Sequence, residues 1–184
     1  WEVVGDLSAL GHRIYELFMI DGSLFAANDS LAEIYKSENP TAGASAAWTE
    51  IKPEPFVAGS ISQFYATEAT NEVGYTIFAG GYLQTDSGEA DIRLRVLRSD
   101  DGGDSWVQTT GLPTEPWPEG GGPMSDLVFA GGSFYTTAIF QTENKIRRSL
   151  NFGSNWQDME EQVPELTRTD SLLYDGEYLY VGGA

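Results

Sequence analysis

Two stretches of this chain share one pattern: RSDDGGDSWV at residues 98–107 and RSLNFGSNWQ at residues 148–157. Each contains a serine, an Asp or Asn two residues later, then a glycine, and a tryptophan at the same distance from the serine. Asp, Asn and Ser side chains accept hydrogen bonds from nearby backbone N–H groups, and glycine adopts backbone conformations that strain other residues. The pattern therefore predicts a tight turn that a tryptophan ring covers.

The tryptophans also mark a repeat. Trp1, Trp48, Trp106 and Trp156 recur at intervals of about fifty residues, a length typical of repeat folds. Before each of the last three lie an alternating run and two apolar runs beside glycines, so each unit contains four short strands. Four antiparallel strands in about fifty residues are typical of a β-propeller blade. A β-sandwich also contains such strands but does not require the repeat. The predicted fold is therefore all-β, a β-propeller built from four-stranded antiparallel blades.

The repeat also suggests a domain organisation. We expect a single β-propeller domain, or part of one, with three full blades and a split blade made by the two termini. The full blades are expected at about 12–53, 60–113 and 124–164, and the partial strands at 1–8 and 169–184. The chain is then either part of a longer propeller or a half-ring that a second copy completes head to tail.

The turn pattern resembles a known repeat. Ser-x-Asp-x-Gly-x-x-Trp is the Asp-box, or BNR repeat, and through the repeat the resemblance covers essentially the whole chain. The matching residues are Ser99, Asp101, Gly103 and Trp106; then Ser149, Asn151, Gly153 and Trp156; and, in a longer copy, Ser37, Asn39 and Trp48. Asp-box propellers include sialidases, xyloglucan-active glycosidases, sortilin-type receptors and photosystem II assembly factors. The resemblance implies that the box is structural and that ligands bind on the opposite face.

Loops on that opposite face provide the candidate ligand site. TGLPTEPWPEGGGPM at 110–124 and YLQTDSGEADIR at 82–93 combine a tryptophan with several acids. The candidate ligand-binding residues are Trp117, Glu115, Glu119, Asp86 and Asp91. An aromatic ring beside carboxylates is the usual arrangement for holding a sugar, and paired carboxylates could supply acid–base chemistry. The alternative is that Trp117 packs under a proline-rich loop and that the acids are solvated.

Charge and composition restrict the partners. The formal net charge is −18, from 28 acidic and 10 basic residues, which argues against nucleic acid or an anionic membrane as a partner. It suits a secreted, cell-surface or periplasmic protein. The chain has no cysteine, so disulfides and thiol chemistry are excluded. We expect no cofactor and no metal site, although calcium could bind the acidic loop 86–91, whose spacing matches no calcium-binding pattern.

The sequence favours binding over catalysis. Sialidases use an arginine triad and a Tyr/Glu nucleophile pair, and they begin with a Phe/Tyr-Arg-Ile-Pro motif. In this chain Arg13 and Ile14 are followed by Tyr15, where the motif has proline. The single histidine, His12, argues against a Ser-His-Asp relay. We therefore expect a non-catalytic binding or scaffold module for a glycan or protein partner. The alternative is a glycoside hydrolase, sialidase-like or xyloglucanase-like, with acidic catalytic residues on the face opposite the boxes.

Overall fold

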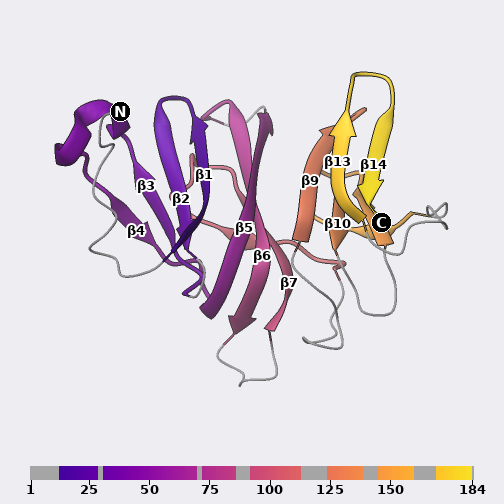
Figure 1. The fold of residues 1–184 in the computed structure, drawn as a ribbon, viewed down its shortest axis with the longest axis horizontal. Helices are drawn as coiled ribbons and strands as arrows, with labels where there is room; N and C mark the ends of the chain where they lie inside the picture. The colour runs from indigo at the N-terminus through magenta and orange to yellow at the C-terminus, as the bar shows by residue number, and fades with distance from the viewer. Residues whose placement is uncertain are drawn as a thin grey trace.

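The computed structural model is all-β and built from antiparallel sheets (Figure 1). It describes residues 13–28, 31–69, 72–85, 92–112, 124–138, 145–159 and 169–183. Within these ranges the one helical element is a short 3₁₀ helix, η2 (Pro40–Ser45). No helix in the described part is long and apolar enough to cross a membrane.

Among the described residues, three of the sheets have four strands and one has two. Sheet 1 contains β1 (Ile14–Ile20), β2 (Ser23–Asn28), β3 (Ile34–Ser37) and β4 (Thr49–Ile51). Sheet 2 contains β5 (Phe56–Glu68), β6 (Tyr75–Thr85), β7 (Ile92–Ser99) and β8 (Val107–Gln108). Sheet 3 contains β9 (Met124–Ala130), β10 (Ser133–Ala138), β11 (Lys145–Ser149) and β12 (Gln157–Asp158). Sheet 4 contains β13 (Thr169–Tyr174) and β14 (Leu179–Gly183).

Local sequence explains why each sheet is a meander. Strands that are consecutive in the chain are neighbours in their sheet, because short turns join them. Asp21 and Gly22, for example, both have positive φ, 47° and 79°, and reverse the chain between β1 and β2. This Asp-Gly pair forms the kind of two-residue turn that matches the twist of an antiparallel hairpin. The predicted four-strand units are thus observed as sheets.

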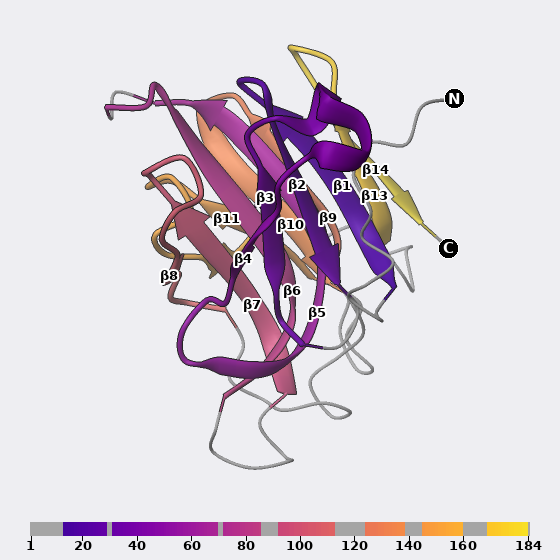
Figure 2. The same cartoon turned by 90° about the vertical axis from the view of Figure 1, so that its left-hand side faces the viewer.

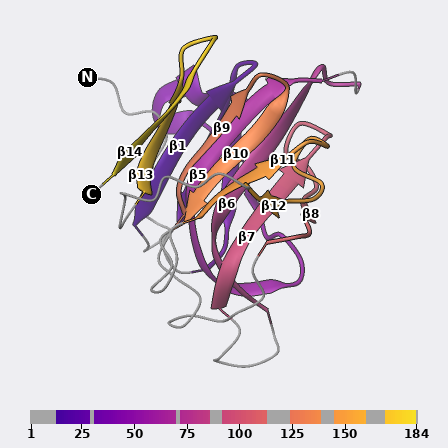
Figure 3. The same ribbon diagram turned by 90° about the vertical axis from the view of Figure 1, so that its right-hand side faces the viewer.

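The sheets lie in a row in chain order (Figures 1 and 2). The first strands are neighbours: β1 packs beside β5, β5 beside β9, and β9 beside β13. In the described part of the chain the row is open, with sheet 1 at one end and sheet 4 at the other (Figure 1). Figure 3 views the molecule from the sheet 4 end, where β13 and β14 lie nearest.

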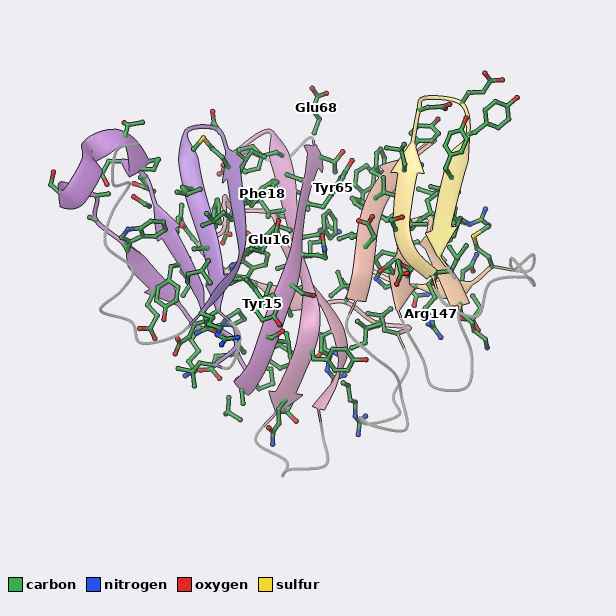
Figure 4. All side chains as sticks on the ribbon, in the orientation of Figure 1. Tyr15, Glu16, Phe18, Tyr65, Glu68 and Arg147 are labelled. Atoms are coloured by element: carbon green, nitrogen blue, oxygen red, sulfur yellow. The ribbon has the colours of Figure 1, made fainter. Side chains whose placement is uncertain are left out.

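Apolar side chains fill the spaces between neighbouring sheets. Between sheets 1 and 2, the Phe18 ring stacks on the Phe64 ring with centroids 5.9 Å apart. Between sheets 2 and 3, the Phe78 and Phe134 centroids are 4.2 Å apart. Figure 4 shows Phe18 between β1 and β5, and Tyr65 between β5 and β9. Both faces of sheet 2 are therefore covered by neighbouring sheets.

The same cross-strand positions recur in every sheet. In each hairpin of first and second strands, one directly opposed pair lies on the side of the sheet that, in sheets 1 and 2, faces the next sheet in the row. The pairs are Phe18–Phe25, Tyr65–Phe78, Val128–Tyr135 and Leu173–Tyr180. Since side chains alternate along a strand, the neighbouring positions lie on the other side, which in sheets 2 and 3 faces the preceding sheet. Those positions on the first strands are Leu17, Phe64, Leu127 and Leu172.

Candidate functional site

The box of sheet 2, residues 99–106, joins β7 to β8. Ser99 Oγ donates to Asp101 Oδ1 at 2.8 Å and accepts from the Gly103 N–H at 2.9 Å. Asp101 also accepts from the Ser105 N–H at 2.9 Å and from its hydroxyl at 2.5 Å. The Trp106 ring is buried, and its Nε1–H donates to the Gly103 carbonyl at 3.0 Å. These are the local bonds that the sequence predicts for a covered turn.

The carboxyl group of Asp101 is ionised in this turn. Partial burial works to raise the pKa of Asp101, but the hydrogen bonds from Ser105 and Ser99 outweigh it and lower the pKa below its usual value of 3.8. The charged form is therefore the one that the turn stabilises.

The box of sheet 3, residues 149–156, has the same geometry with an amide in place of the carboxylate. Asn151 Oδ1 accepts from Ser149 Oγ and from the Asn155 N–H, each at 2.9 Å. Trp156 differs from Trp106 in its donor, because its Nε1–H reaches Thr109 Oγ1 at 3.2 Å. Thr109 follows β8, so this bond links sheet 3 to sheet 2.

The longer copy in sheet 1 keeps part of the pattern. Asn39 Oδ1 accepts from Ser37 Oγ at 3.3 Å and from the Ala47 N–H at 3.0 Å. The additional residues form η2. The Nε1–H of Trp48 is buried and has no acceptor among the described residues. The Asn-based turn is thus kept, while the tryptophan bond of the other two copies is not.

The box glycines are also required by packing between sheets. A Cβ on Gly103 would lie 2.5 Å from Phe25 Cε1, and one on Gly153 would lie 2.4 Å from Phe78 Cε1. Both glycines have positive φ, 91° and 70°. Each box is therefore pressed against a phenylalanine on the second strand of the preceding sheet, where only glycine leaves room.

The ligand-binding residues proposed from the sequence lie outside the described residues. This applies to Trp117, Glu115, Glu119, Asp86 and Asp91. Within the described ranges, no group of three or more His, Asp or Glu side chains could hold a metal ion.

One open groove lies between sheet 2 and the box of sheet 3, and we call it the Phe152 groove. Its volume is about 790 Å³, and its lining residues are Glu68, Ala69, Thr76, Arg98, Asp100, Asn151 and Phe152. Figure 4 shows Glu68 at the end of β5. The lining combines an aromatic ring, an amide, two carboxylates and a guanidinium group.

Two charged groups of the Phe152 groove, Arg98 and Asp100, are bonded to one another. Asp100 accepts from Thr76 Oγ1 at 2.6 Å and from Arg98 Nε at 3.0 Å. The Arg98 guanidinium also donates to the Phe152 carbonyl at 3.2 Å and to Ser154 Oγ at 2.9 Å. Arg98 therefore ties sheet 2 to the box of sheet 3, and Asp100 holds the guanidinium in place.

Phe152 has a strained backbone and an exposed ring. Its φ is 51°, a left-handed conformation that costs a bulky residue on the order of 1 to 2 kcal/mol. Its side chain is 41% exposed, although the ring lies 5.8 Å from the Phe129 ring, centroid to centroid. The complete box has Gly102 at this position. The sequence gives no signal for Phe152, because the box pattern allows any residue at this position.

A second groove, also of about 790 Å³, lies beside the box of sheet 1. Lys36 crosses it: the Nζ atom is 2.7 Å from Asp104 Oδ1 and 3.3 Å from Glu38 Oε1. Asp104 belongs to the box of sheet 2, so this lysine joins two sheets as Arg98 does. The groove has no exposed aromatic ring among its lining residues.

A buried carboxylate lies in sheet 1. Glu33 accepts from Asn28 Nδ2 at 2.8 Å and from the Tyr35 hydroxyl at 2.5 Å, and Lys52 Nζ is 3.4 Å away. Burial, together with the adjacent Glu33, raises the pKa of Tyr35 well above its usual value, so the phenol stays protonated. Asn28 begins an Asn-Asp-Ser sequon, but its side chain is fully buried and cannot accept a glycan in the folded protein.

Comparison with known proteins leaves the family open. No protein-family model matches the chain, and no curated protein matches its sequence. The functional argument therefore rests on the geometry of the described residues.

Proposed function

We propose that the chain is a non-catalytic binding module whose sheets are blades of an Asp-box β-propeller. Three observations support the propeller: the four-stranded meanders, the row of adjacent first strands, and the boxes between third and fourth strands. The resemblance of the box pattern adds to them. The resemblance implies ligands on the face opposite the boxes, whereas the Phe152 groove includes box residues, so its binding role rests on its own geometry.

The observation that carries the binding function is the strained, half-exposed Phe152 at an open groove. A bulky residue in a left-handed conformation is unfavourable, and strain of this kind is concentrated at functional sites. The ring offers an apolar surface beside Asn151, Asp100 and Glu68, which can hydrogen-bond to hydroxyl groups. A glycan fits this combination, since sugar rings stack on aromatic faces while their hydroxyls bond to amides and carboxylates.

The bonds of Asp100 support binding over hydrolysis. Asp100 already accepts from Thr76 and pairs with Arg98, so its carboxylate acts as a fixed acceptor. The glycoside hydrolase alternative depends on Glu115, Glu119 and Asp86, which lie outside the described residues.

The test is glycan binding by two matched variants. Wild type, Phe152→Ala and Leu150→Ala are applied to an oligosaccharide array, and any glycan that binds is titrated by calorimetry. Leu150 is the control, because it is 61% exposed in the same hairpin but does not line the groove. Loss of an aromatic stack is expected to weaken binding about 10- to 100-fold in Phe152→Ala and to leave Leu150→Ala unchanged. Equal affinities for the two variants, or no glycan bound by wild type, would contradict the assignment of this groove as a glycan site.

A further inference from the structure

Apolar side chains are exposed on the outward faces of both end sheets. On sheet 1, Leu17 and Met19 are 58% and 59% exposed and point away from sheet 2, since they alternate with Phe18. On sheet 4, Leu173 and Tyr180 are 65% and 50% exposed. We call these the β1 face (Leu17, Met19) and the β13–β14 face (Leu173, Tyr178, Tyr180).

These exposed positions are interface positions elsewhere in the row. The residues equivalent to Leu17 are Phe64, Leu127 and Leu172, which are only 7%, 4% and 7% exposed. The residues equivalent to Tyr180 in sheets 1 and 2 are Phe25 and Phe78, both fully buried. Inside the row these five residues are buried, and Tyr135, the sheet 3 equivalent of Tyr180, is partly buried. The two end faces therefore have the side chains of an intersheet contact without the sheet that would complete it.

The two faces also match in width. On the outward side of sheet 1, the exposed apolar positions lie on β1. Residues of the same side on β2 and β3 are already buried: Ala26, Tyr35 and Ser37 are 0%, 3% and 0% exposed. A partner therefore has to cover only the inner part of sheet 1. The two strands of sheet 4 in the described part, β13 and β14, offer a face of this kind.

We propose that the β13–β14 face of one copy of this chain packs on the β1 face of a second copy, head to tail, so that two copies close a ring. The described part of each copy contributes four sheets, and the resulting eight fall within the range of about four to eight blades seen in propellers. The two contacts are identical by two-fold symmetry, although each joins two different faces. This proposal rests on the repeated packing of the sheets and is independent of glycan binding at the Phe152 groove.

Charge predicts how the association responds to salt. Each chain carries a formal charge of −18, so two copies repel one another at low ionic strength. Salt screens this repulsion and leaves the apolar contact in place. The dimer is therefore expected to tighten as salt is raised.

The experiment measures mass in solution by light scattering on a sizing column, at loading concentrations up to about 100 µM. Wild type is compared with Leu17→Glu, Leu173→Glu, an equimolar mixture of these two, and the control Val107→Glu. Val107 is 66% exposed on β8, outside both faces. Because all three positions are exposed, the glutamates leave folding intact, which circular dichroism and urea unfolding verify.

Wild type and Val107→Glu are expected at twice the 20.1 kDa mass of one chain. Each face variant alone is expected to raise the dimer dissociation constant by about 100-fold or more, since a carboxylate would be buried in an apolar contact. The mixture is expected to regain dimer, because the intact β13–β14 face of Leu17→Glu meets the intact β1 face of Leu173→Glu. A monomeric wild type, larger polymers, or loss of dimer in only one of the two face variants would each overturn the two-copy ring.

Discussion

The substitution Gly103→Ala tests whether each box is pressed against the preceding sheet. The added Cβ would lie 2.5 Å from Phe25 Cε1, far inside the closest approach of real carbon atoms. The neighbouring Gly102 offers a matched control: its φ of 75° is close to the 91° of Gly103, but the nearest side-chain atom to a Cβ there is 3.5 Å away. The two alanines therefore introduce similar backbone strain and differ in the steric clash.

The magnitudes follow from these two effects. Left-handed strain costs an alanine about 1 kcal/mol or somewhat more. Forcing an additional carbon into a packed core typically costs about 1 to 3 kcal/mol. We therefore expect Gly102→Ala to lower the free energy of unfolding by about 1 kcal/mol and Gly103→Ala to lower it by about 2 to 4 kcal/mol.

Urea unfolding followed by tryptophan fluorescence measures both values. A double mutant sharpens the comparison: Phe25→Leu removes the ring that the new methyl group would strike. In that background Gly103→Ala should cost about as much as Gly102→Ala does. If Gly103→Ala and Gly102→Ala are equally destabilising in the wild-type background, the box is not held against Phe25 and the intersheet argument is wrong.

Two further predictions concern the boxes. Burial works to raise the pKa of Asp101, but the hydrogen bonds from Ser105 and Ser99 outweigh it and lower the pKa in the folded chain. The stability that ionised Asp101 contributes is therefore complete above the unfolded-chain pKa of 3.8. It is lost as the pH falls through the lower pKa of the folded chain. Asp101→Asn should therefore have a lower free energy of unfolding than wild type at about pH 6, and this difference should narrow below about pH 4. Urea unfolding at a series of pH values measures the difference. A difference that widens in acid would refute the assignment. Thr109→Val, after β8 of sheet 2, leaves the buried Trp156 Nε1–H of sheet 3 without its acceptor at 3.2 Å. This should lower the free energy of unfolding by about 1 to 3 kcal/mol. A double-mutant cycle with Trp156→Phe should show a coupling of about 1 kcal/mol between the two side chains, whereas additive effects would mean that the bond contributes nothing to stability.

Local chemistry is what the sequence could predict. The bonds among Ser99, Asp101 and Gly103 join residues at most four apart, so short spacing in the chain is enough to bring them together. The same holds for the Asp21-Gly22 turn and for the alternation along the strands. Four-stranded units therefore follow from the repeat, and the observed sheets agree with that prediction.

The candidate site shows where such reasoning stops. Composition alone points to Trp117 and Asp86, and both residues lie outside the described ranges. Phe152 occupies a position at which the box pattern accepts any residue, and Arg98 lies just before the pattern begins at Ser99. Their importance comes from contacts across two sheets, and Arg98 reaches Ser154, far along the chain.

The sequence by itself determined that the chain is all-β, that its strands come in repeated units, and that tight turns separate the third and fourth strands. Only the tertiary structure decided why Gly103 must be a glycine, because the atom it would strike belongs to Phe25 on another sheet. It also decided that Leu17 is exposed while the equivalent Phe64, Leu127 and Leu172 are buried. The physical reason is that the burial of a side chain depends on which sheet packs against its face. The spacing of residues along the sequence does not say which faces are covered in this way.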